Sequence, residues 1–148
     1  LLNDGPNFLS GHLEVNNEFG GLAQSKEKYD GKIRAKRISN DFEQLNTVIG
    51  IIATDAPLNR MQLKRMSIMC HGSISRSIHP SHTPMDGDTI FAISTSDKSL
   101  NVYEEISKLD LTIISSIASD TFSRACNRAI FEAKNIGGKP SWKDLFES

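Results

Sequence analysis

Two short apolar runs in the middle of the chain predict two β-strands. Residues 48–53 read VIGIIA and residues 89–94 read TIFAIS. Both runs are continuous and rich in β-branched or aromatic residues, which is typical of strands buried on both faces. Residues 10–20, SGHLEVNNEFG, predict a further short strand that ends near Asn16 and Asn17.

Apolar positions that recur every three or four residues predict a helix after the first of these runs. Asn59 is a suitable N-cap, with Gln62 three residues later, and the helix is expected to end near Ile78, before Pro80. One apolar stripe follows the helix and consists of Leu63, Met66, Cys70, Ile74 and Ile78.

A second helical pattern covers residues 101–135 and is expected to stop at Gly137-Gly138. It carries an apolar stripe and a ridge of alanines suited to close packing: Ile106, Leu109, Ile113 and Ile117, then Ala118, Ala125, Ala129 and Ala133. The amphipathic tail SWKDLFES is expected to dock through Trp142 and Leu145. Strands and helices in this order predict an α+β fold, with helices packed on a mixed sheet.

Composition and charge fit one soluble globular domain and exclude several other classes. The chain has 148 residues and a net charge of −1, which argues against a nucleic-acid or membrane partner. No apolar run approaches transmembrane length. The two cysteines, Cys70 and Cys126, fall within helical patterns, so we expect reduced core thiols and a cytoplasmic location.

Thr47 is the most suggestive position for chemistry, because it stands at the start of the first apolar run. A threonine hydroxyl needs a base to become a nucleophile, and the threonine's own α-amine can be that base. Thr47 has a free α-amine only if the chain is cut between Asn46 and Thr47. Attack of the Thr47 hydroxyl on the Asn46 carbonyl, followed by ester hydrolysis, would make that cut.

Asp86 and Asp88 flank Gly87 immediately before the second run, where the sheet would bring them beside Thr47. A carboxylate near an α-amine can orient it, and glycine permits close approach of the backbone. By spacing alone, Asp-Gly-Asp also fits a surface turn, and Asn46-Thr47 also fits a cap or turn.

The clustered histidines His71, His79 and His82 lack the spacing of a zinc site, so we expect neither a metal nor a cofactor. We expect His82 to order its loop, and both cysteines to be core residues and not nucleophiles.

Three stretches together resemble the L-aminopeptidase/D-esterase family, which includes β-peptidyl aminopeptidases and nylon-oligomer hydrolases. They read NTVIGIIATDAPLNRMQLKRM, HGSISRSIHPSHTPMDGDTIFAIST and SDTFSRACNRAIFEA, and the resemblance runs from about Gly11 to the end. It implies a four-layer αββα sandwich related to the ornithine acetyltransferases. It also implies a precursor that cleaves itself and exposes an N-terminal Ser or Thr nucleophile.

Carried onto this sequence, the resemblance implies cleavage between Asn46 and Thr47, with Thr47 as nucleophile and Asp86 and Asp88 as the acid pair. It implies an asparagine that stabilises the oxyanion, with Asn17 preferred over Asn16. Residues 1–46 would be the C-terminal remnant of the first subunit, with an exposed loop at 20–44, and residues 47–148 the second subunit. The sandwich and its catalytic centre would therefore be incomplete in this chain.

The function implied is that of an aminopeptidase or amidohydrolase acting on short peptides, amides or amide oligomers, assembled as a homo-oligomer of cleaved units. Two alternatives stay open. One is a truncated, inactive relative that serves as a folded or interaction module. The other is acyl transfer like that of the ornithine acetyltransferases. If residues 1–148 fold alone, an apolar sheet face should be exposed where the missing part would pack.

Overall fold

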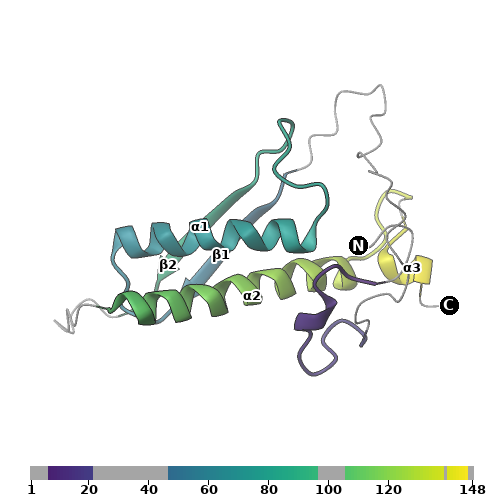
Figure 1. The fold of residues 1–148 in the computed structure, drawn as a ribbon. Coiled ribbons are helices and arrows are strands. Elements are labelled where there is room, and N and C mark those ends of the chain that lie inside the picture. Colours follow the sequence, from purple (N-terminus) through teal and green to yellow (C-terminus); the bar gives the residue numbers. More distant parts are fainter. Residues whose placement is uncertain (1–6, 22–46, 97–105, 139, 147–148) are drawn as a thin grey trace.

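The computed structural model describes residues 7–21, 47–96, 106–138 and 140–146, and these residues form an α+β fold (Figure 1). The elements are, in chain order, η1 (Gly11–Leu13), β1 (Ile49–Thr54), α1 (Arg60–Ser77), β2 (Thr89–Ser94), α2 (Lys108–Glu132) and α3 (Trp142–Phe146). The two strands and two long helices thus confirm the main elements predicted from the sequence.

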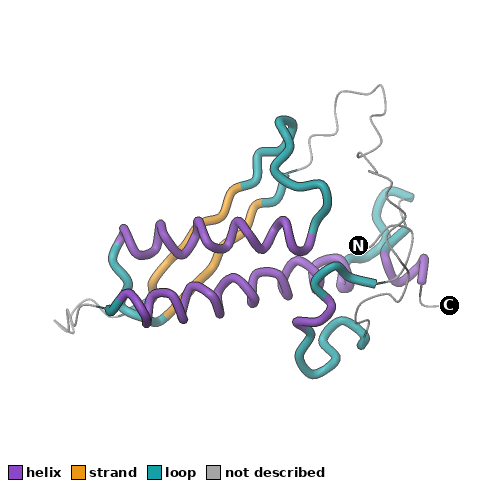
Figure 2. Tube along the Cα trace, viewed as in Figure 1, coloured by secondary structure: helices purple, strands orange, loops and turns teal. Residues whose placement is uncertain are grey.

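The sheet consists of two parallel strands joined by α1, which makes one βαβ unit. Its register runs from Ile49 opposite Thr89 to Thr54 opposite Ser94. Figure 2 shows α1 and α2 side by side along this sheet. The prediction of a mixed sheet is wrong for the described residues, because both of their strands point the same way.

The two faces of the sheet differ sharply in exposure. Ile52 and Ile90 point toward the helices and are 8% and 6% exposed. The alternate positions point away and are apolar but exposed: Ile49, Ile51, Phe91 and Ile93. Burial on both faces was therefore the wrong prediction, while the expected exposed apolar face is confirmed. We call these four residues the outer sheet face.

Helix α1 forms as its sequence predicts. The Asn59 side chain accepts hydrogen bonds from the backbone N–H groups of Met61 and Gln62, and the Gln62 side chain accepts one from Asn59 N–H at 2.8 Å. This capping box satisfies N–H groups that the first turn of a helix leaves without intrahelical partners. The stripe of α1 packs under the sheet through Met66, Cys70 and Ile74.

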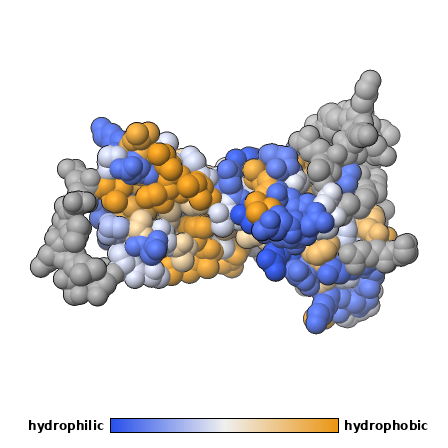
Figure 3. Space-filling view, turned by 90° about the horizontal axis from the view of Figure 1, so that it is seen from below, coloured by the Kyte–Doolittle hydropathy of each residue, from blue (hydrophilic) through white to orange (hydrophobic). Residues whose placement is uncertain are grey.

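Helix α2 is shorter than predicted and presents a different face to the core. It ends at Glu132, five residues before Gly137, and residues 101–105 of the predicted helix lie outside the described residues. Leu109, Ile113 and Ile117 of the predicted stripe face outward, and Ala125 and Ala129 are also exposed. Ile106 and Ala118, by contrast, pack in the core as predicted. Figure 3 shows hydrophobic residues gathered over the part of the molecule that holds the strands and the first turns of α2.

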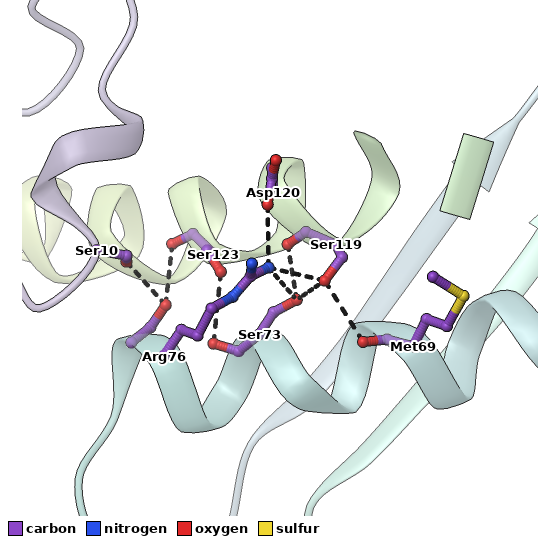
Figure 4. Close-up of polar contacts among 8 residues, drawn as sticks. Ser10, Met69, Ser73, Arg76, Ser119, Asp120 and Ser123 are labelled. Atoms are coloured by element: carbon purple, nitrogen blue, oxygen red, sulfur yellow. Dashed lines mark hydrogen bonds and ion pairs between the residues drawn. The ribbon is translucent and has the colours of Figure 1, made fainter. Parts of the chain in front are cut away.

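Serine side chains line the contact between α1 and α2 (Figure 4). Ser73 Oγ donates to the Ser119 carbonyl oxygen at 2.7 Å, and Ser123 Oγ approaches the Ser73 carbonyl oxygen at 3.5 Å. Arg76 donates to Ser119 Oγ at 2.8 Å and pairs with Asp120 at 3.1 Å. The hydroxyls of Ser73, Ser119 and Ser123 keep hydrogen-bond partners in this close contact, whereas the buried Ser115 Oγ has none. A sequence pattern that counts serine as polar therefore assigns this buried face to solvent.

The N-terminal segment, residues 7–21, packs against the far end of the helices and not against the sheet. Phe8 and Phe19 form an aromatic cluster with Trp142, and Phe131 and Phe146 pack around it. Docking of the tail through Trp142 is confirmed, but Leu145 is 58% exposed, so its predicted role is wrong.

The strand predicted for residues 10–20 is also wrong, because this stretch forms η1 and a series of turns. Asn16 and Asn17 have positive φ angles of 54° and 58°, which asparagine tolerates better than most residues. The Glu14 carboxylate accepts hydrogen bonds from the N–H groups of Phe19 and Gly21 and holds the turns together.

In the part of the chain that the structure describes, no helix is both long and apolar enough to cross a membrane.

Candidate active site

Thr47 lies at the entry to β1, and its neighbour Val48 is fixed from two sides. The Val48 carbonyl oxygen accepts a hydrogen bond from Thr89 N–H at 2.8 Å, which continues the parallel ladder. The Val48 N–H donates to Asp88 Oδ1 at 2.9 Å. A side-chain carboxylate thus occupies the position that a backbone carbonyl would take in a longer strand, and this fixes the backbone directly after Thr47.

Gly87 approaches the Thr47 side chain closely. A Cβ atom at Gly87 would lie 3.3 Å from Thr47 Oγ1 and 3.6 Å from Thr47 Cγ2. Thr47 itself is an exposed residue. Because side chains alternate along a strand, Thr47 is on the same side as Ile49 and Ile51, which belong to the outer sheet face.

The two aspartates have different surroundings. The Asp88 side chain is only 4% exposed, and both of its oxygens accept hydrogen bonds or ion-pair contacts from named groups. Asp86 Oδ2 accepts from Thr83 N–H at 3.0 Å, while Asp86 N–H donates to the Thr83 carbonyl oxygen at 2.9 Å. Asp86 therefore closes the turn that leads into Gly87, and Asp88 reaches across to β1.

His82 contacts this site, although its sequence context predicts chiefly a residue that orders its loop. Its Nδ1 lies 3.0 Å from Asp88 Oδ2, and its backbone N–H donates to the same oxygen at 3.3 Å. Its Nε2 lies 3.2 Å from the carbonyl oxygen of His71 in α1. The only signal in the sequence is that His82 precedes the Asp-Gly-Asp by four residues, and this alone does not predict a contact.

The structure brings Thr47, Asp86 and Asp88 to one end of the sheet, but Asn17 lies elsewhere. Asn17 Oδ1 folds over Gly21 in its own turn, and the adjacent Glu18 pairs with Arg124 of α2. Figure 1 shows residues 7–21 below α2 and the start of β1 above α1. An oxyanion role for Asn17, or for Asn16 in the same turn, therefore stays a prediction, and Asn46 lies outside the described residues.

The cysteines are unsuited to nucleophilic chemistry. Burial raises the pKa of both thiols, Cys70 and Cys126, to about 11. Both thiols are therefore protonated near neutral pH, and the thiolate is the reactive form. In residues 7–21, 47–96, 106–138 and 140–146, no group of three or more His, Cys, Asp or Glu side chains is arranged to hold a metal ion.

A family model described as peptidase family S58 matches residues 6–142. The chain is 35% identical over 107 residues to an uncharacterised aminopeptidase of Mycobacterium bovis, a match that covers 68% of this chain and 31% of that protein. A similar protein of Mycobacterium leprae is 29% identical over 135 residues, covering 87% of this chain and 36% of the relative.

A third relative is a 6-aminohexanoate-oligomer endohydrolase of an Agromyces strain. It is 32% identical over 90 residues, which cover 58% of this chain and 25% of that enzyme. The chain thus spans about a third of the length of the curated relatives it matches. No solved structure matches the chain significantly.

Proposed function

The chain belongs to peptidase family S58, the L-aminopeptidase/D-esterase family, and on this premise we propose that it carries the nucleophile of a self-cleaving hydrolase. The family and the named relatives support hydrolase activity of the aminopeptidase or oligomer-hydrolase kind. The finer proposal is that Thr47, freed at its α-amine by cleavage after Asn46, is the attacking group.

The observation that carries this proposal is the fixed position of Thr47. Asp88 and Thr89 hold Val48 on either side, and Gly87 leaves room for the Thr47 side chain. Accurate placement of a nucleophile supplies a large part of enzymatic rate enhancement. An exposed threonine on an otherwise unconstrained loop would lack this property.

Self-cleavage would begin when the Thr47 hydroxyl attacks the Asn46 carbonyl carbon. The peptide C–N bond breaks, an ester forms between Asn46 and Thr47 Oγ1, and the nitrogen takes up a proton to become the α-amine of Thr47. Water then hydrolyses the ester, which leaves a carboxylate on Asn46 and the free hydroxyl on Thr47. A free α-amine has a pKa of about 7.7–8.0 in general, so much of it can accept a proton near neutral pH.

In the mature enzyme, that amine would take the proton of the Thr47 hydroxyl as Oγ1 attacks the carbonyl carbon of a substrate amide. The protonated amine then gives the proton to the leaving nitrogen, and water releases the acyl group from Thr47. Asp86 and Asp88 would orient the amine from the Gly87 side. We propose short peptides, amides or amide oligomers as substrates, which the names of the relatives support.

We also propose that the mature enzyme has the αββα sandwich. The described residues supply one helix layer and one sheet layer, and the outer sheet face is apolar and exposed. We propose that a second sheet covers this face in the mature enzyme. Thr47 would then lie at the junction of the two sheets, in a homo-oligomer of cleaved units in the cytoplasm.

The proposal is tested with the full-length gene product. Wild-type protein is assayed on aminoacyl p-nitroanilides and on 6-aminohexanoate oligomers, beside Thr47→Ala and Thr47→Ser. We expect activity in the wild type, a slower reaction with serine, and none above background with alanine. Full activity of Thr47→Ala would overturn the proposal, and net acyl transfer to an amino-acid acceptor would favour the acyltransferase alternative.

A further inference from the structure

We propose that His82 is a positioning residue that holds the Asp88 carboxylate against the backbone of Val48 and so fixes Thr47. This inference rests on the function proposed for Thr47, and it assigns His82 a positioning role and not a catalytic one. It follows from a continuous series of contacts that starts in α1, passes through the loop before β2 and ends at β1.

The first part of this series anchors the His82 ring to α1. His82 Nε2 lies 3.2 Å from the carbonyl oxygen of His71, and the two imidazole rings lie 5.3 Å apart. The His71 carbonyl belongs to a helix that packs in the core, so it offers a rigid support. The ring of His82 thereby has a fixed orientation although its side chain is 37% exposed.

The second part of this series is the contact between the His82 ring and Asp88. His82 Nδ1 lies 3.0 Å from Asp88 Oδ2, which leaves Asp88 Oδ1 to accept the hydrogen bond from Val48 N–H at 2.9 Å. A carboxylate held at one oxygen cannot rotate away from a partner at the other. The Asp88 side chain is 4% exposed, so water does not readily replace either contact.

The two ring nitrogens both face groups that only accept hydrogen bonds. Nδ1 faces a carboxylate and Nε2 faces a backbone carbonyl oxygen. A neutral imidazole has one N–H group, so both contacts become hydrogen bonds only in the doubly protonated ring.

Substitutions that tolerate the backbone conformation of His82 can test its side chain without disturbing the loop. His82 has a φ of 54°, in the left-handed region that asparagine, aspartate and glycine adopt more readily than most residues. Asparagine places an N–H donor near the position of Nδ1. Aspartate has almost the same shape but presents only acceptors, and glycine removes the side chain altogether.

The test introduces His82→Asn, His82→Asp and His82→Gly into the full-length gene product. The readouts are the first-order rate of chain cleavage before Thr47 and the kcat and KM of the mature enzyme. We expect His82→Asp and His82→Gly to lower the cleavage rate and kcat on the order of 10-fold to 10²-fold, with little change in KM, because they misplace the nucleophile. His82→Asn should stay within a few-fold of wild type.

The pattern among the three variants decides the matter. If all three match the wild type, or if His82→Asn is as slow as the other two, the proposal is overturned. If His82→Gly does not fold, the comparison of asparagine with aspartate gives the same decision. His12→Ala, an exposed histidine in η1, is the matched control and should behave as wild type.

Two further variants separate failure of this inference from failure of the proposed function. In an Asp88→Asn background, His82→Gly should have little additional effect, because His82 acts through Asp88. If His82→Gly lowers the cleavage rate and kcat as much in the Asp88→Asn background as in the wild type, then His82 does not act through Asp88. If Thr47→Ala remains cut and active, the proposed function itself fails. If Thr47→Ala is uncut and inactive while His82→Gly is normal, only the role of His82 fails.

Discussion

At the scale of single residues, the site depends on short contacts around Thr47. Asp88 holds the backbone on one side of the threonine side chain, and Gly87 lies beside it. Gly137 and Gly138 have φ angles of 58° and 76°, in the left-handed region, whereas the φ angle of Gly87 lies outside that region. A side chain at position 87 would therefore act by crowding Thr47 and not by straining the backbone.

Gly87→Ala should disturb the nucleophile without unfolding the protein. The added Cβ would lie 3.3 Å from Thr47 Oγ1, which is close enough to displace the hydroxyl by a few tenths of an ångström. We expect kcat and the rate of self-cleavage to fall about 10-fold, since small errors in placement are costly. Activity assays and a thermal melt measure the two effects. A variant with wild-type kcat would show that Gly87 does not set the position of Thr47.

The sequence predicts the proximity of Thr47 and Asp88 but not the details of the contact. Both residues stand at the beginnings of apolar runs, and parallel pairing brings such positions together. The bond from Asp88 to Val48 N–H, and the support from His82, depend on the left-handed turn at His82 and on a carbonyl of α1. No local pattern encodes a contact between a loop and a helix backbone eleven residues away.

At the scale of elements, local signals predict α1 well and α2 poorly. The cap at Asn59 and the regular apolar stripe determine where α1 begins and which side it buries. In α2, the buried side carries Ser115, Ser119 and Ser123, whereas Ile113 and Ile117, which suggest a core face, are exposed. The side of a helix that becomes buried depends on the element that packs against it. The apolar pattern of the helix alone does not reveal that element.

Gly50→Ala should destabilise the contact of β1 with α2. A Cβ at Gly50 would lie 2.3 Å from two carbons of the Phe122 ring, which is 6% exposed and has little room to move. We expect a loss of about 1–3 kcal/mol in the free energy of unfolding, as for other overpacked cores. Denaturant unfolding measures it as a lower midpoint.

Gly72→Ala is the matched control for that experiment. Gly72 is an exposed residue of α1, and nothing lies within 4 Å of its Cβ position. The same substitution there should raise stability by about 0.5–1 kcal/mol, because alanine favours a helix over glycine. Equal effects at both positions would contradict the close packing of Phe122 on β1.

Glu18 links residues 7–21 to α2 through an ion pair with Arg124. Arg124 Nη2 lies 2.9 Å from Glu18 Oε2, and the hydrogen bond from Arg124 lowers the pKa of the Glu18 carboxyl. A lowered carboxyl pKa stabilises the folded state above the ordinary value of about 4.3, and this stabilisation is lost as the pH falls below it.

Glu18→Gln should therefore lower the melting temperature of the full-length protein at pH 7, by an amount equivalent to about 1 kcal/mol. The difference from wild type should begin to shrink as the pH falls below about 4.3, because the Glu18 carboxyl of the unfolded wild-type chain then binds a proton before that of the folded chain. Melting curves at several pH values measure this. A difference that stays constant with pH would mean that the charge of Glu18 contributes nothing.

At the scale of the whole molecule, the outer sheet face decides how the described residues relate to the complete protein. Exposed, contiguous apolar surface of this kind marks an interface. Residues 48–53 and 90–93 carry no polar side chain on either face of the strands, a pattern typical of strands that are covered on both sides. The chain spans about a third of the length of the curated relatives it matches.

Lysine substitutions at Ile51 and Phe91 should distinguish an exposed face from a covered one. In the full-length protein we expect each to abolish folded, soluble product, because the charge would be buried between two sheets. Met61→Lys is the control, since Met61 is 72% exposed on α1 and should tolerate the change. Soluble yield and melting temperature are the measurements. Wild-type stability of both sheet variants would contradict a covering sheet.

The central claim is that Thr47 becomes an N-terminal nucleophile, and the mass of the purified full-length protein tests it most directly. We expect two fragments whose masses place the break between Asn46 and Thr47, and one uncut chain for Thr47→Ala. An uncut wild-type chain that nevertheless hydrolyses its substrate would contradict the account, because Thr47 would then have no free amine to act as its base.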